Sequence, residues 1–456
     1  MGKVQCAQND MLLQATASTY QTGRAGTALR RGSAIGVLVL FVLLGILLLR
    51  GRGAVASVRT VALGQPTRGQ TVASLGIDPR TGHAVVVTNS SGNGANFVST
   101  VDVATGTLLK TSAVGPGLTA VSPATRRGLI FISTSGLGGD GRVTLVRSRA
   151  GTVDRTVALP QDPGAIAIDE QIDRAFVVGV NGTALNVLDA RTGAMLRTVT
   201  VGKNGNVGTS PQRVAVDTRT GRVFVVNSND NTVSVLDART GRLLRNIPVG
   251  AFPISVAVDE RTSRAFVLTI MSRTISVIDT ATGRIVRTEP LAAPAATLAI
   301  DPQRSLVFVP LLSPPFSGAG SHVEVLDARS GRMVRMLAVE GTATAIGVDG
   351  RHGRLFVAIA APEDRRRNLT GPARVSIFDT QRGAVIQTVP VVADPFAVAV
   401  DERTGYALVA STGSASAPGD SWGWVPAWLR GRLPFLGSKK AYTAPPATVS
   451  VIAPTQ

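Results

Sequence analysis

The stretch that decides the fold is residues 213–250, RVAVDTRTGRVFVVNSNDNTVSVLDARTGRLLRNIPVG. Apolar and polar residues alternate through TVSVLD, and Val, Ile and Phe are enriched, which favours strands over helices. The pattern predicts four short strands separated by turns. They are Val214–Asp217, Val223–Asn227, Val233–Asp237 and Leu243–Val249.

This unit recurs along residues 57–456 with a spacing of 42 to 52 residues. The end of the first strand is marked by Asp78, Ser122, Asp169, Asp217, Asp259, Asp301, Asp349 and Asp401. A period of about 40–50 residues with four strands is typical of a β-propeller blade. The sequence therefore predicts an all-β propeller of eight four-stranded blades. Seven is the alternative if the degenerate second unit, marked by Ser122 and Arg147, is a distortion.

Closure of the ring is also predicted. The last unit stops after its third strand, TVSVIAPTQ, while Ser57–Gly64 (SVRTVALG) resembles the fourth strand LLRNIPVG of the unit above. We therefore expect the N-terminal segment to supply the missing outer strand of the last blade, which removes an open edge.

The turns have a common chemistry. DARTG at 189–193 and 237–241 joins strands three and four, and DTRTG at 217–221 joins strands one and two. Asp accepts hydrogen bonds from backbone N–H groups just ahead of it, and Gly supplies the positive φ that ends the turn. Calcium ligation by these aspartates is not expected, because the ordered loop with a central Gly and a closing Glu is absent.

These units resemble the YVTN-repeat β-propeller family (YncE-like and surface-layer-protein-like propellers). Val86-Val87-Thr88-Asn89 and Phe224-Val225-Val226-Asn227 match the tetrad that names it. The resemblance covers residues 57–456 and implies the fold and an extracytoplasmic location. It implies no activity, because many members have none assigned.

The composition excludes several kinds of metal and disulfide site. The single cysteine, Cys6, excludes a disulfide framework and a cysteine metal cluster, and the three histidines, at 83, 322 and 352, form no ligand motif. The formal charge of +18 permits an anionic partner without naming one. We expect no metal and no cofactor.

The N-terminus contains a candidate membrane span. Gly32–Leu49 (GSAIGVLVLFVLLGILLL) is 18 residues without a charge, enough to cross a bilayer core as a helix. We interpret it as a signal anchor between a disordered polar tail, residues 1–31, and a short linker, residues 50–56. A signal peptide cleaved near Ala56, in the small-x-small sequence Ala54-Val55-Ala56, is the alternative, with secretion as its result. A buried soluble helix is a third reading.

The linker suggests which face of the propeller lies toward the membrane. In an up-and-down blade the one–two and three–four turns share one face, here called the turn face, and the opposite side is the loop face. The chain enters its first strand from the turn face after seven linker residues, which reach at most about 25 Å. We therefore expect the turn face, with its arginines, to lie toward the membrane.

One long insertion, residues 411–446, interrupts the last blade on the loop face. It holds all three tryptophans, Trp422, Trp424 and Trp428, together with Phe435. A hydrophobic cap on the blade rim, a partner-binding anchor and a second membrane contact all fit this composition.

Ligand sites of propellers often lie at the channel mouth, at the beginnings of the innermost strands. Two positions there in each of eight blades contain one charge, Arg213, and no carboxylate or histidine for acid–base or metal chemistry. An anionic ligand for Arg213 and a solvated loop arginine both fit. The candidate binding residues are Arg213, Gln212, Ser255, Thr297 and Thr344.

The sequence thus favours a membrane-tethered, extracytoplasmic, monomeric propeller that binds a protein, polymer or small ligand without catalysis. A lactonase-like hydrolase with a site at the channel mouth is the first alternative. Binding of an anionic polymer or nucleic acid is the second, disfavoured because the turn face mixes Arg with Asp and lacks stacking aromatics.

Overall fold

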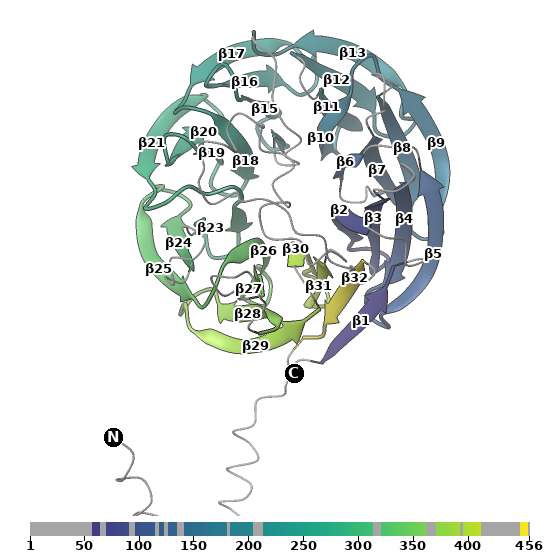
Figure 1. Ribbon diagram of the computed structural model, residues 1–456. Coiled ribbons are helices and arrows are strands. Elements are labelled where there is room, and N and C mark those ends of the chain that lie inside the picture. The colour runs from purple at the N-terminus through teal and green to yellow at the C-terminus, as the bar shows by residue number, and fades with distance from the viewer. Residues whose placement is uncertain are drawn as a thin grey trace, which may run out of the picture. The chain divides into compact units, whose positions relative to one another are not determined.

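The computed structural model places eight four-stranded antiparallel sheets in a propeller ring (Figure 1). It describes residues 57–63, 70–90, 96–114, 118–122, 126–134, 141–179, 183–203, 213–312, 321–361, 371–392, 395–411 and 447–454. The tail, the candidate span and linker (1–56), Gln212 and all but Ser411 of the insertion 411–446 lie outside these residues. None of the described residues forms a helix with the length and hydropathy of a bilayer-spanning segment.

The first blade contains β2 (Gln70–Asp78), β3 (His83–Ser90), β4 (Asn96–Asp102) and β5 (Thr107–Val114). The second contains β6 (Leu118–Val121), β7 (Leu129–Thr134), β8 (Arg142–Arg147) and β9 (Thr152–Ala158). The third contains β10 (Pro163–Asp169), β11 (Arg174–Gly179), β12 (Ala184–Asp189) and β13 (Met195–Thr200). The fourth contains β14 (Val214–Asp217), β15 (Arg222–Asn227), β16 (Thr232–Asp237) and β17 (Leu243–Pro248).

The fifth blade contains β18 (Pro253–Asp259), β19 (Arg264–Thr269), β20 (Thr274–Asp279) and β21 (Arg284–Pro290). The sixth contains β22 (Ala299–Asp301), β23 (Leu306–Pro310), β24 (Ser321–Asp327) and β25 (Met333–Val339). The seventh contains β26 (Ala343–Asp349), β27 (Arg354–Ile359), β28 (Ala373–Asp379) and β29 (Val385–Val391). The eighth contains β30 (Pro395–Asp401), β31 (Tyr406–Ser411), β32 (Thr448–Ile452) and β1 (Val58–Ala62).

Two predictions are confirmed. The degenerate second unit is a complete blade, so the ring has eight blades rather than seven, and the eighth sheet has the order β1-β32-β31-β30. Val58 of β1 pairs with Ile452 and Ala62 with Thr448, so the N-terminal strand closes the ring from the turn face. Arg403 of the eighth blade also donates to the carbonyl of Pro79 in the first, 2.9 Å away.

The fourth strand of each blade is its outer strand, and these outer strands follow the circumference in Figure 1. Proline occurs in three of them, as Pro248, Pro290 and Pro390. Proline cannot donate to a sheet ladder, so an edge strand is where a sheet tolerates it. In these three blades the outer edge therefore resists pairing with another chain.

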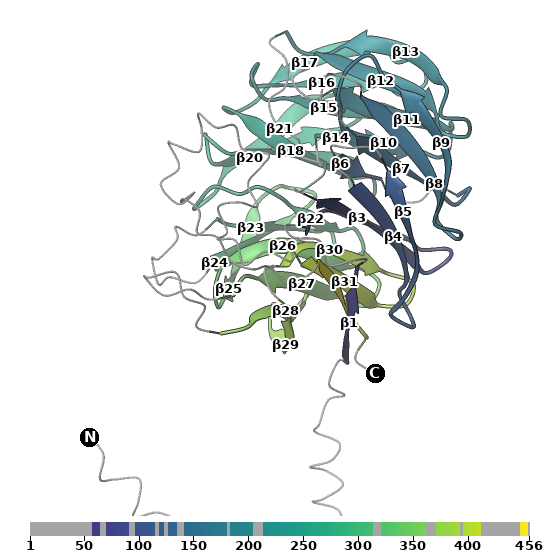
Figure 2. The ribbon, with the colours of Figure 1, turned by 45° about the vertical axis from the view of Figure 1, so that its right-hand side comes forward.

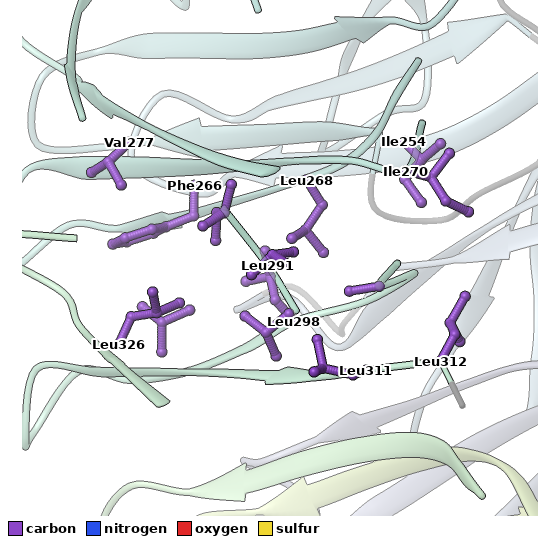
Figure 3. Packing of buried hydrophobic residues seen from close by; sticks show 14 of the residues in the cluster. Ile254, Phe266, Leu268, Ile270, Val277, Leu291, Leu298, Leu311, Leu312 and Leu326 are labelled. Carbon is purple, nitrogen blue, oxygen red and sulfur yellow. The ribbon is translucent and has the colours of Figure 1, made fainter. Parts of the chain in front are cut away.

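The core lies between blades, because the second and third strands are buried on both faces. Phe131, Phe176, Phe224, Phe266, Phe308 and Phe356 fill equivalent positions of six second strands and are at most 1 % exposed. Between blades five and six the cluster extends from Phe266 and Val277 to Leu298 and Leu312 (Figure 3). Packing of one blade on the next therefore holds the ring together.

The Asx-turn prediction is confirmed. The Asp237 carboxylate accepts hydrogen bonds from the Thr240 backbone N–H and hydroxyl, both 2.8 Å away. Gly241 ends that turn with a φ of 68°. The Thr240 backbone N–H lowers the pKa of Asp237, against the opposing effect of burial, and Arg222 adds to the lowering.

Candidate functional site

The innermost strand of each blade lies next to the ring centre (Figures 1 and 2). Two positions before the terminal Asp or Ser, every blade has Gly or Ala: Gly76, Ala120, Ala167, Ala215, Ala257, Ala299, Gly347 and Ala399. The next position is Ile or Val in every blade. A Cβ added to Gly347 would lie 2.7 Å from Val398 of the adjoining blade, so close packing requires glycine there. These positions offer no acid or base.

The first strands end in seven buried aspartates, and one carboxylate oxygen of each accepts a hydrogen bond from a backbone N–H of the following turn. They are Asp78, Asp169, Asp217, Asp259, Asp301, Asp349 and Asp401, each at most 1 % exposed. Asp78 Oδ2 accepts from Ser148 in the second blade at 2.5 Å, and Asp349 Oδ2 lies 2.8 Å from His352 Nδ1. In the described part of the chain, no group of three or more His, Cys, Asp or Glu side chains is placed to hold a metal ion.

The predicted mouth residues that are described lie in four successive blades. Arg213 immediately precedes β14, Ser255 lies on β18, Thr297 precedes β22 and Thr344 lies on β26. Arg213 and Ser255 come from neighbouring blades whose innermost strands pack together. Ser255 is buried, whereas Thr297 and Thr344 are half-buried, and the Thr344 hydroxyl donates to the Ala358 carbonyl at 3.3 Å. The tryptophans and Phe435 belong to the insertion outside the described residues.

The solvated-arginine reading of Arg213 is wrong, because its side chain is buried at 2 % exposure. Burial lowers the pKa of Arg213 to about 10, so the guanidinium stays protonated at neutral pH. Among the residues that the structure describes, Arg213 is the largest fully buried side chain by residue volume. A buried cation at the start of an innermost strand breaks the repeat symmetry, since the other blades have Ser, Thr, Ala or Leu there.

Arginines of the outer strands join successive blades on the turn face. Arg155 donates to the Thr192 carbonyl at 2.6 Å and Arg335 to the Thr380 carbonyl at 3.0 Å, each in the following blade. Arg59 of β1 makes the same bond across the closure, to Thr105 at 2.8 Å. Equivalent bonds run from Arg197 to Thr240 and from Arg245 to Gly283. Part of the basic charge is therefore structural.

A buried glutamate was missed at the sequence level. Glu324 of β24 is 1 % exposed, and its Oε1 accepts from the Ala292 backbone N–H at 2.8 Å. The corresponding third-strand positions hold short polar residues, Ser99, Thr144, Asn186, Ser234, Ser276, Ser376 and Ser450. Aligning the third strands, which end in Asp327 and its counterparts, would have revealed this exception.

Glu324 makes stability depend on pH. Burial raises the pKa of Glu324 and nearby Glu289 adds to the effect, against the Ala292 N–H. A folded-state carboxyl pKa above the unfolded value favours folding at low pH, and this contribution is lost as pH rises from about 4.5 through the folded pKa. We expect Glu324→Gln to stabilise the chain by about 1–2 kcal/mol at pH 8 and by less at pH 4.5.

Thermal unfolding at both pH values measures this effect. Glu340→Gln is the matched control, because the Glu340 side chain is 94 % exposed. Equal shifts of the melting temperature for Glu324→Gln at pH 4.5 and pH 8 would show that the Glu324 carboxylate is not the destabilising group.

No family model and no curated protein sequence matches the chain. The YVTN resemblance therefore rests on the residues quoted above. Among solved structures, Kuenenia stuttgartiensis hydrazine synthase is 17 % identical with a TM-score of 0.51, covering 66 % of this chain and 94 % of that one.

Two further solved structures share the fold. Saccharomyces cerevisiae Sqt1 is 14 % identical, with a TM-score of 0.56 over 74 % of this chain and 90 % of that chain. A europium-containing methanol dehydrogenase is 12 % identical, with a TM-score of 0.55 over 87 % and 93 %. At these identities the likeness shows a β-propeller and leaves enzymatic and binding roles both open.

Proposed function

We propose that this chain is a membrane-tethered, extracytoplasmic β-propeller of the YVTN-repeat kind that acts as a binding module. The observation that carries the proposal is the position of β1. Its first residue, Val58, pairs with the last residue of β32 at the turn face. The uncharged run Gly32–Leu49 ends eight positions before Ser57.

The short linker limits which face of the propeller can lie near the membrane. Residues 50–56 span at most about 25 Å even when fully extended. A helix formed by 32–49 would hold the turn face near the bilayer and leave the loop face open to a ligand.

Buried Arg213 supports a binding role at the loop-face mouth. A desolvated guanidinium binds carboxylate, sulfate or phosphate oxygens more strongly than one in water does. Two further mouth positions, Thr297 and Thr344 of blades six and seven, are polar and half-buried. A polar mouth with one buried guanidinium suits an anionic small ligand or an acidic side chain of a protein. The aspartates of the innermost strands cap turns at the opposite end of these strands from the mouth.

Membrane extraction tests the tether. We expect the full chain to stay with membranes in alkaline carbonate and to retain its N-terminal tail. A variant without residues 32–49 should become extractable. A mature chain that begins near Ala56 and is released from cells would replace the anchor with a cleaved signal peptide.

Replacement of Arg213 tests whether the channel mouth binds an anion. With ionic strength held constant by chloride, we expect sulfate to raise the melting temperature of the wild-type chain and to have a much smaller effect on Arg213→Met. Arg239→Met, at an exposed turn position, should respond like wild type. An equal sulfate response in wild type and Arg213→Met would contradict anion binding at Arg213.

A further inference from the structure

Exposed apolar side chains concentrate on the outer strands. Among the described residues, thirteen of the fifteen exposed large hydrophobic side chains lie there, all within the first four residues of a strand. We call the following residues the rim set: Leu108, Leu109, Val153, Met195, Leu196, Leu243, Ile285, Val286, Met333, Val334, Met336, Val385 and Ile386. Blades one to seven each contribute at least one member.

The rim set lies beside the turn face. Each outer strand begins after a three–four turn, and Met195, for example, pairs with Leu188 close to that turn. Because the outer strands follow one another round the circumference (Figure 1), the rim set extends along seven of the eight blades. Its members are 36 % to 55 % exposed, with Val334 the most exposed.

Blade packing does not explain these side chains. The residue two positions beyond Met195 or Met333 is an arginine that makes the inter-blade contact, Arg197 with Thr240 and Arg335 with Thr380. Further along the same strands, Ile247, Leu337 and Val389 are buried and supply the apolar contacts of the blade. The rim set therefore presents apolar surface that the fold itself does not use.

We infer that the rim set docks the turn face into the interfacial layer of a lipid bilayer. This inference rests on the proposed tether. The side chains enter the region between headgroups and acyl chains, and the ring lies with its turn face toward the membrane. Contact is made by several blades at once.

The distribution of the rim set favours a bilayer over a protein partner. A protein partner of ordinary size would contact part of a propeller, and its site would be concentrated on a few blades. A bilayer is uniform in its plane and matches apolar residues repeated around a ring. The anchor, through its short linker, would bring this same face to the membrane.

The charges beside the rim set also suit a bilayer. Arg191, Arg239, Arg329 and Arg382 are exposed in three–four turns, next to the outer strands that carry the rim set. The same turns also begin with Asp189, Asp237, Asp327 and Asp379, so the charge beside the rim set is mixed. The apolar side chains therefore supply the main attraction, and the arginines add a weaker contact with anionic headgroups. The combination is typical of interfacial attachment.

Site-directed fluorescence in proteoliposomes tests the inference. The full chain, with Cys6→Ser as background, is labelled with an environment-sensitive fluorophore at Leu109→Cys, Leu196→Cys or Val334→Cys. It is reconstituted into phosphatidylethanolamine–phosphatidylglycerol vesicles with and without lipids that carry a quencher near the carbonyl groups. Met271→Cys is the control, because Met271 is 40 % exposed in the loop between β19 and β20 on the opposite face.

We expect the quencher to reduce emission about twofold at all three rim positions and to leave Met271→Cys unchanged, as shallow interfacial burial predicts. Quenching at Leu109 alone, beside the tether, or at none of the three would overturn the docking. Vesicle flotation tests separately whether the chain is attached to the membrane. A chain that floats without rim quenching refutes only this inference, whereas a chain that does not float refutes the proposed tether.

Discussion

Replacing Val61 by Asp is expected to destabilise the whole propeller. Val61 lies on β1, is 8 % exposed and packs in a cluster with Leu63, Val449 and Val451. An unpaired carboxylate in this apolar cluster costs several kcal/mol, because no polar or charged group there replaces the water that it loses. We expect a loss of about 4 kcal/mol or more, since an eighth blade without its outer strand exposes its edge and opens the ring closure.

Thr60→Asp is the matched control, because Thr60 is exposed on the same strand and pairs with Ser450. Its stability should fall by less than about 1 kcal/mol. Calorimetry of both variants, with limited proteolysis of the eighth blade, measures the difference. Similar melting temperatures for the two variants would mean that β1 is not needed to close the ring.

Replacing Phe266 by Ala is expected to cause the second large loss of stability. Its ring is fully buried between Val277 and Leu326 in the cluster between blades five and six (Figure 3). Phe266→Ala removes that contact and leaves a cavity, which costs about 3–5 kcal/mol. We expect Phe266→Leu to lose about 1–2 kcal/mol, since most of the volume is retained.

Denaturant unfolding of both variants gives the two losses. Because each blade contacts its two neighbours, the transition should move to lower denaturant without splitting into separate steps. A small loss for Phe266→Ala would show that the interface collapses to fill the space and that the ring is not closely packed there.

The repeat made most of the fold predictable. The predicted strands of residues 213–250 differ from β14–β17 by at most one residue at either end. The alternation of apolar and polar residues, together with the Asp–Gly turns, specifies the strands of each blade. The missing fourth strand of the last unit indicates how the ring closes. Register follows as well, since Asp217 pairs with Arg222 and Asp237 with Arg222 across adjacent strands.

Side chains that depart from the repeat could not be placed from the sequence. Arg213 reads as a solvated residue in a loop, yet the fold buries it, because burial depends on the neighbouring blade as well as on the strand. Glu324 occupies a third-strand position whose burial the strand pattern predicts, but its contact with Ala292 comes from the link that precedes the sixth blade. The outer-strand arginines likewise find their carbonyl partners one blade further on.

The most direct test of an outward-facing, tethered propeller is thiol labelling of intact cells with a membrane-impermeant maleimide, with any outer barrier opened. The native Cys6 reports on the tail and Met271→Cys reports on the loop face. We predict that Met271→Cys reacts in intact cells and that Cys6 reacts only after lysis. Labelling of Met271→Cys only after lysis would place the propeller in the cytoplasm and contradict the account.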